Sequence, residues 1–139
     1  MPNGSSTISG WGRIPVPGRE VLSEDLERLT EGAVLSRGLG RSYGDSALPP
    51  PSVGEVATTT LADRLLAFDP ESGLLRAEAG LSLKELNRLF LPRGWFVPVT
   101  PGTQFVTLGG MVAADVGMLA AGGLHLNYDT SVTGLLEIR

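Results

Sequence analysis

The sequence predicts an α+β domain in which short strands and short helices alternate along the chain. The 139 residues include 19 glycines and 10 prolines, which interrupt the apolar segments and keep every predicted element short. No internal repeat or low-complexity stretch is present. A chain of this length is one domain or part of one, and it buries about two thirds of its unfolded surface on folding.

Two helices are predicted by the residues that flank them. Ser23 is expected to cap a helix that runs through Glu31, with Gly32 as its stop. Ser82 and Glu85 have the spacing of a capping box for a second helix. Each helix carries apolar residues on one face: Leu22, Leu26 and Leu29 for the first, and Leu83, Leu86, Leu89 and Phe90 for the second.

The strands are predicted by short apolar runs between turn residues. Residues 34–35 and 55–59 each read as a short strand. Residues 65–68 and 74–79 are expected to pair as a hairpin, because the sequence Asp-Pro-Glu-Ser-Gly between them favours a turn. A further strand is expected within residues 132–139.

The first functional candidate is the glycine-rich segment at residues 36–45, Ser-Arg-Gly-Leu-Gly-Arg-Ser-Tyr-Gly-Asp. Glycines reach the positive φ angles that turn successive backbone N–H groups into an anion-binding concavity. Arg37 and Arg41 add donors that match phosphate oxygens. The spacing G-x-G-x-x-x-G is one residue longer than the Rossmann fingerprint, and no Gly-Lys-Ser/Thr of a P-loop follows. The segment is therefore either a phosphate cradle or a glycine-rich surface turn with solvated arginines.

A second pair of turn signals follows at residues 97–103 and 107–115. Pro101 and Gly102 favour a tight turn. Gly109 and Gly110, followed by small residues, allow the backbone to approach a flat ligand or another segment closely.

Together the two segments resemble the flavin-binding half of the vanillyl-alcohol-oxidase, or p-cresol-methylhydroxylase-type (PCMH-type), FAD family. Within that family they look most like the decaprenylphosphoryl-β-D-ribose 2′-oxidase branch. Its first loop has the form R-G-x-G-R-S-Y-G-D and its second P-G-T-x-x-V-T-x-G-G-x-x-A-x-D, and this chain fills every fixed position at residues 37–45 and 101–115. The resemblance covers roughly residues 10–116, which correspond to the opening part of such an enzyme.

The resemblance implies a PCMH-type FAD-binding domain made of an N-terminal βαβ lobe and the start of a second lobe, incomplete in this chain. Residues 10–116 would form that domain, residues 1–9 a flexible tail and residues 117–139 a divergent C-terminal segment. The implied function is that of the FAD-binding portion of an oxidoreductase, which oxidises a sugar or alcohol carbon by hydride transfer to flavin N5.

The resemblance also implies which residues contact FAD. Residues 37–46 would surround the pyrophosphate, mainly through backbone N–H groups, while residues 114–116 would run beside the isoalloxazine. The implied cofactor-binding residues are Ser36, Arg37, Gly38, Leu39, Gly40, Arg41, Ser42, Tyr43, Gly44, Asp45, Ser46, Gly102, Thr107, Leu108, Gly109, Gly110, Ala114, Asp115, Val116 and Gly117. Three of them have structural alternatives: Tyr43 as a packing aromatic, Asp45 as the cap of its own turn, and Arg41 as a salt-bridge partner.

After Val116 the sequence departs from the family pattern. Similar enzymes continue with H-G-K-N-H-H, whereas Gly117 occupies the histidine position here, and His125 is out of register. No catalytic residue is therefore assigned. The alternative function is a truncated or degenerate nucleotide-binding or interaction module without turnover. The uncharged run at residues 117–124 is expected to expose apolar surface that a further protein segment or chain would cover.

Composition limits the other function classes. The formal charge of −4 and the pI of about 4.9 provide no general basic field, so nucleic acid is not an expected partner. The absence of cysteine and the single histidine argue against a disulfide framework and a metal centre. No apolar run reaches the ~20 residues of a membrane span and no signal peptide is evident, which predicts a cytoplasmic chain.

Overall fold

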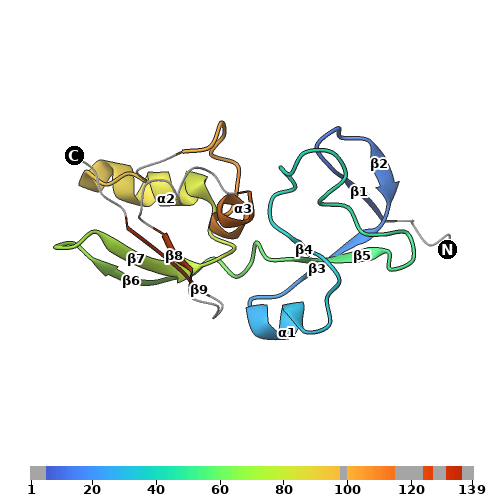
Figure 1. Ribbon diagram of the computed structural model, residues 1–139, viewed down its shortest axis with the longest axis horizontal. Coiled ribbons are helices and arrows are strands. Elements are labelled where there is room, and N and C mark those ends of the chain that lie inside the picture. The colour runs from blue at the N-terminus through green and yellow to red at the C-terminus, as the bar shows by residue number, and fades with distance from the viewer. Residues whose placement is uncertain (1–5, 98–99, 115–123, 127–130, 136–139) are drawn as a thin grey trace.

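The computed structural model describes residues 6–97, 100–114, 124–126 and 131–135. The chain forms two lobes that lie side by side, joined by the segment between β5 and β6 (Figure 1). Both lobes combine strands with helices, in agreement with the predicted α+β class. None of the helices among the described residues is long and apolar enough to cross a membrane. Cytoplasmic location stays a prediction.

The N-terminal lobe contains a parallel three-stranded sheet with the order β3-β5-β4 and a separate antiparallel pair, β1 and β2. Helix α1 connects β3 to β4, which gives the right-hand part of Figure 1 a βαβ arrangement. The elements of this lobe are β1 (Thr7–Ser9), β2 (Pro15–Pro17), β3 (Arg19–Leu22), α1 (Leu26–Thr30), β4 (Ser36–Arg37) and β5 (Glu55–Thr58).

Two boundaries of this lobe differ from the sequence-based expectation. The tail expected at residues 1–9 is wrong at its end, because residues 7–9 form β1 and pair with β2. The strand expected at residues 34–35 begins two residues later, since residues 36–37 are the ones in register with β5. β1 pairs with β2 in a local hairpin across residues 10–14, whereas β4 is placed by β5, a segment distant in sequence that a local pattern does not encode.

Helix α1 is capped by a different residue from the one expected. Asp25, not Ser23, is the N-cap, and its carboxylate accepts a hydrogen bond from the backbone N–H of Arg28 at 3.0 Å. The hydroxyl of Ser23 accepts from the Asp25 N–H and so shapes the turn before the helix. The predicted stop is confirmed, because Gly32 follows the C-cap with φ +70°.

The second lobe is built on an antiparallel sheet with the order β6-β7-β9-β8. The predicted hairpin is confirmed by β6 and β7, and the predicted C-terminal strand by β9, which pairs with β7. The segment 115–123 lies outside the described residues. The elements of this lobe are β6 (Leu65–Asp69), β7 (Leu74–Glu78), α2 (Leu83–Phe90), the 3₁₀ turn η1 (Leu91–Arg93), α3 (Leu108–Ala113), β8 (Leu124–Leu126) and β9 (Ser131–Leu135).

The core of this lobe forms between α2, α3 and the hairpin. The hydroxyl of Ser82 accepts from the Glu85 N–H at 3.2 Å and caps α2 as predicted, while the Glu85 carboxylate accepts from the Arg88 side chain. Phe68 packs edge-on against Trp95, with ring centroids 5.2 Å apart. The buried core residues are Leu75, Ala77, Leu81, Leu83, Leu86, Phe90, Val97, Leu108 and Met111.

A buried carboxylate fixes the start of the second lobe. Glu78, on β7, is 6% exposed and accepts three hydrogen bonds from Arg64: one from its backbone N–H at 2.9 Å and two from its guanidinium. These bonds hold the pKa of Glu78 below its ordinary value of 4.5. The ion pair therefore anchors the segment that leads from the first lobe into β6.

Replacing Glu78 with glutamine is expected to lower the free energy of unfolding by about 1–2 kcal/mol near neutral pH, because the neutral amide loses charge-assisted bonds. The folded pKa lies below the ordinary one, so the stabilisation is present above the ordinary value of 4.5 and is lost as the pH falls through the folded pKa. Urea unfolding at about pH 7 and about pH 3 measures both effects. An equal loss in Glu71→Gln, which changes an exposed carboxylate, would contradict this role.

Candidate cofactor site

The glycine-rich loop, residues 38–46, follows β4 directly. Gly40 and Gly44 have φ +70° and +62°, so two of its three glycines adopt the left-handed conformation that the motif predicted. None of the backbone N–H groups of residues 38–46 donates a hydrogen bond to another described residue. The loop therefore presents a run of unused donors, the arrangement that an anion-binding concavity requires.

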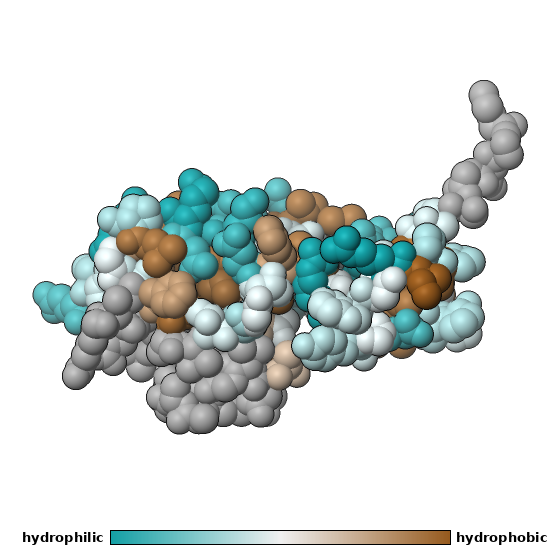
Figure 2. All heavy atoms as spheres, turned by 90° about the horizontal axis from the view of Figure 1, so that it is seen from above, coloured by the Kyte–Doolittle hydropathy of each residue, from teal (hydrophilic) through white to brown (hydrophobic). Residues whose placement is uncertain are grey.

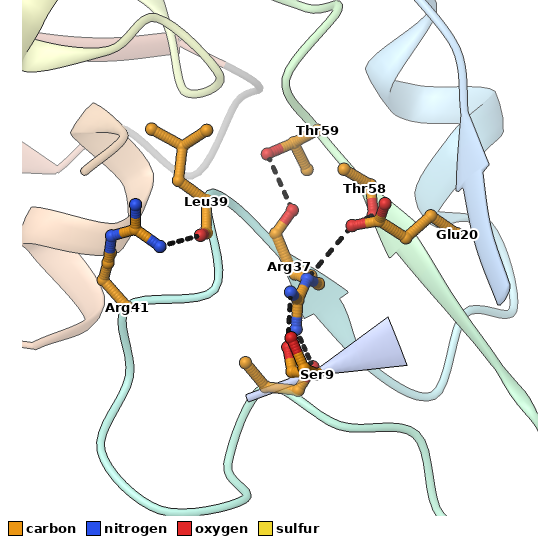
Figure 3. Close-up of polar contacts among 8 residues, drawn as sticks. Ser9, Glu20, Arg37, Leu39, Arg41, Thr58 and Thr59 are labelled. Carbon is orange, nitrogen blue, oxygen red and sulfur yellow. Dashed lines mark hydrogen bonds and ion pairs between the residues drawn. The ribbon is translucent and has the colours of Figure 1, made fainter. Parts of the chain in front are cut away.

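Arg37 has a structural role that the sequence did not predict. Its side chain is 10% exposed, and its guanidinium donates to the carbonyls of Ser9 and Ala47 at 2.8 Å each and to the Glu20 carboxylate at 3.1 Å (Figure 3). All of these partners belong to the protein. The Arg37 side chain therefore holds the base of the loop, and its contact with a phosphate stays a prediction.

Arg41 is placed differently. Its exposed side chain donates only a long hydrogen bond, 3.3 Å, to the carbonyl of Leu39, and it forms no ion pair with any described residue (Figure 3). The alternative in which Arg41 is a salt-bridge partner is therefore not supported within the described part of the chain. A guanidinium of this kind remains available for an external anion.

The other residues of the loop are exposed. Tyr43 is 79% exposed and contacts the ring of Trp11 edge-on, with centroids 5.2 Å apart. The alternative role of Tyr43 as a packing aromatic is therefore limited to its contact with Trp11. The turn after Asp45 is closed by a backbone bond from Leu48 N–H to the Asp45 carbonyl at 2.9 Å. The hydroxyl of Ser46 donates to the Tyr43 carbonyl at 3.0 Å.

The second motif uses its backbone donors within the protein. Thr107 is the N-cap of α3, and its hydroxyl accepts from the Gly110 N–H at 3.0 Å. The N–H groups of Leu108 and Gly109 donate to the carbonyls of residues 81 and 79 at 2.8 and 2.9 Å. These residues can approach a ligand closely, but their N–H groups are already occupied.

The two motifs meet in the structure. A Cβ atom added to Gly38 would lie 2.4 Å from the Thr107 hydroxyl oxygen and 3.0 Å from its methyl group. Gly109 packs against Ala79 in a similar way, at 3.1 Å. The segments at residues 36–46 and 107–110 therefore lie in contact, and the contact depends on the missing side chain at residue 38.

Not every expected residue joins this contact. Gly102 is exposed, and a Cβ atom added there would meet no neighbouring atom within 4 Å. Ala114 is exposed at the end of α3. Asp115, Val116 and Gly117 lie outside the described residues. The contact of these five residues with a flavin stays a prediction.

A cavity of about 560 Å³ opens beside the glycine-rich loop. The turn between β1 and β2, residues 10–13, forms its other wall, and its sequence, Gly-Trp-Gly-Arg, did not predict a part in the site. The sequence feature that could have indicated this wall is the pair of glycines around an aromatic residue, followed by an arginine. The lining residues are Ser9, Gly10, Trp11, Arg13, Arg37, Gly40 and Arg41. No group of three or more metal-ligating side chains occurs among the described residues.

Comparison with known proteins identifies the family. The model of the FAD binding domain family matches residues 28–129, which include the glycine-rich loop and most of the second lobe. The chain belongs to the FAD binding domain family. The recognition of a PCMH-type flavoprotein, the α+β fold class and FAD as the cofactor are thereby confirmed.

Named relatives are all longer proteins. The decaprenylphosphoryl-beta-D-ribose oxidase of Mycolicibacterium smegmatis is 36% identical over 127 residues, which are 84% of this chain and 27% of the relative. The D-2-hydroxyglutarate dehydrogenase of Escherichia coli is 33% identical over 78 residues, which are 55% of this chain and 7% of the relative. The D-lactate dehydrogenase of Anaerostipes hadrus is 29% identical over 68 residues, 49% of this chain and 14% of the relative.

Solved structures share the fold. Two structures of alkyldihydroxyacetonephosphate synthase align with TM-scores of 0.62 and 0.67, at 14% and 15% identity. They match 85% and 91% of this chain, which in turn covers 32% and 33% of theirs. At this identity the likeness concerns the fold alone. The chain spans about a third or less of the length of each of these proteins.

Replacing Gly38 with alanine is expected to lower the free energy of unfolding by about 1–3 kcal/mol, because the added methyl group overlaps the side chain of Thr107. Chemical denaturation measures the change. Gly102→Ala is the control, since its methyl group meets no atom within 4 Å. Equal stability of the two variants would show that the motifs do not depend on this contact.

Proposed function

We propose that the chain binds FAD with its glycine-rich loop around the pyrophosphate, and that it is the flavin-binding part of an oxidoreductase acting on a sugar or alcohol carbon. Bound FAD would supply hydride acceptance at N5. The protein would bind, orient and shield the cofactor. The observation that carries this proposal is the run of N–H donors at residues 38–46 that have no acceptor among the described residues, because such backbone donors fit a dianionic pyrophosphate.

The positions of the motifs support the same assignment. Gly40 and Gly44 turn the loop backbone, and Arg41 adds a cation without an ion pair among the described residues. On the other side of the Gly38–Thr107 contact, Gly102 and residues 107–110 would approach the adenosine diphosphate and the edge of the ring. Residues 114–117 would continue beside the isoalloxazine.

The substrate class follows from the relatives. Their names state that they act on a ribose derivative, D-lactate and D-2-hydroxyglutarate, each of which carries hydroxyl-bearing carbons. A sugar or alcohol carbon is the common chemical feature. We therefore propose substrate oxidation at such a carbon for the protein that contains this domain.

A second candidate is a nucleotide-binding or interaction module without turnover. It is favoured by glycine at residue 117, where the family pattern has histidine. A further protein segment or chain would then complete the fold. The absorbance spectrum of the purified protein separates the candidates first: a flavin spectrum supports cofactor binding, and a colourless protein that cannot be reconstituted favours the module.

Replacing Gly40 with valine is expected to abolish FAD binding. Residue 40 has φ +70°, and a Cβ there would lie 2.4 Å from the Arg37 guanidinium. Flavin fluorescence titration measures the affinity. Arg41→Ala should weaken binding only by about tenfold, the loss of one charge-assisted bond.

The matched control for this variant is Gly54→Val, because Gly54 has φ +71° with no atom within 4 Å of an added Cβ. It introduces the same backbone strain outside the loop and should retain FAD affinity. Undiminished FAD affinity in Gly40→Val would remove the loop from the cofactor site.

This chain by itself is expected to hold FAD without reducing it at an enzyme-like rate. Positioning of a substrate over the flavin supplies about 7–11 kcal/mol of the barrier reduction, and no residue of this chain is assigned to that task. Anaerobic bleaching of the flavin absorbance by a panel of sugars and alcohols tests the expectation. Rapid bleaching that depends on one of these compounds would contradict it.

A further inference from the structure

The cavity beside the glycine-rich loop is lined on one side by residues that belong to neither FAD motif. Its second wall is the N-terminal turn, residues 10–13, which contributes Trp11 and Arg13. Gly10 allows this turn to approach the loop closely, because a Cβ at residue 10 would lie 3.0 Å from the Gly44 carbonyl and 3.4 Å from the Leu48 side chain. The edge contact of Trp11 with Tyr43 is a second link between turn and loop.

The cavity is locally positive in a chain of net charge −4. Of its three lining arginines, Arg37 is neutralised by Glu20, as Figure 3 shows. Arg13 and Arg41 form no ion pair with any described residue, and the described residues that line the cavity include no acidic side chain. The two arginines without ion pairs give the cavity a local positive charge, which favours an anion over an apolar ligand.

Hydrophilic residues also cover much of the face shown in Figure 2, with apolar residues in separate patches among them.

The backbone of the turn is strained at the arginine. Arg13 is the non-glycine residue with positive φ among those described, at +56°, and its N–H donates to the Gly10 carbonyl at 3.0 Å to close the turn. Left-handed angles are uncommon for a side chain of this kind, and such strain concentrates at binding sites. The turn places a cation on the cavity wall although glycine or asparagine would fit its backbone better.

We propose that this cavity binds a phosphate group, with Arg13 of the N-terminal turn as a phosphate-binding residue beside Arg41. The group belongs either to the pyrophosphate of FAD, which rests on the proposed function, or to a second, phosphorylated ligand. In both cases two guanidinium groups from separate segments face the same anion. Trp11 borders the cavity and offers a flat surface to the part of the ligand next to the phosphate.

Titration calorimetry with inorganic pyrophosphate tests the site in the full chain. Arg13→Asn removes the charge but keeps a residue that tolerates the left-handed backbone, and it should weaken pyrophosphate binding by about tenfold. Arg13→Lys should retain most of the affinity. The control is Arg28→Gln, which removes one exposed cation on α1 and should leave binding unchanged.

Folding and binding are separated by urea unfolding of each variant. If Arg13→Asn does not fold, Arg13→Gly takes its place, because glycine adopts this backbone angle without strain. Pyrophosphate binding that is equal in the Arg13 variant and in Arg28→Gln would overturn the proposal.

FAD titrations distinguish the two sources of the phosphate. If pyrophosphate competes with FAD and the Arg13 variant loses affinity for both, the cavity belongs to the cofactor site. If pyrophosphate still binds the FAD-loaded protein in an Arg13-dependent way, the cavity serves a second ligand. If the chain binds FAD but its binding of pyrophosphate does not depend on Arg13, this inference alone is refuted. If pyrophosphate binding depends on Arg13 but the chain does not bind FAD, only the proposed cofactor is refuted.

Discussion

The guanidinium group of Arg37 connects three segments that are distant in the sequence. It donates to the carbonyl of Ser9 on β1, to the carbonyl of Ala47 at the end of the glycine-rich loop, and to Glu20 on β3. The loop starts after this residue and returns to it, so its ends are fixed while its own N–H groups have no acceptor in the described part of the chain. Gly40 leaves the space that this side chain occupies. The first motif arginine thus shapes the loop from its base.

The two FAD motifs have different physical tasks. The backbone donors of residues 38–46 bond to no described residue, whereas residues 108–110 use theirs on Ala79, Leu81 and the Thr107 hydroxyl. The second motif is therefore rigid and closely packed, and the first is the one able to bind an anion. Their contact at Gly38 and Thr107 places the backbone donors of the first lobe next to the start of α3 in the second lobe. A dinucleotide that spans both lobes would be gripped at its phosphates and supported along its length.

The sequence was informative where local chemistry decides the structure. The hairpin, the cap at Ser82 and the positive φ angles of Gly40 and Gly44 follow from neighbouring residues, and the two loops were recognisable from their spacing. Long-range pairing was not predictable in the same way. Nothing near residues 34–37 signals which of them pair with β5, and nothing near Arg37 signals that its donors are taken by carbonyls from two other segments. The N-terminal turn was not predicted as a cavity wall for the same reason, because only the folded chain places Arg13 and Arg41 on one cavity.

The central claim is that one cofactor contacts both motifs at once. A series of ¹H–¹⁵N correlation spectra of the labelled chain, recorded during an FAD titration, reports on every backbone amide without any substitution. We expect the largest shifts at residues 38–46, with accompanying shifts at residues 107–110 that saturate at the same FAD concentration. Shifts that leave residues 38–46 unchanged, or that saturate separately in the two motifs, would contradict a single FAD site at their junction.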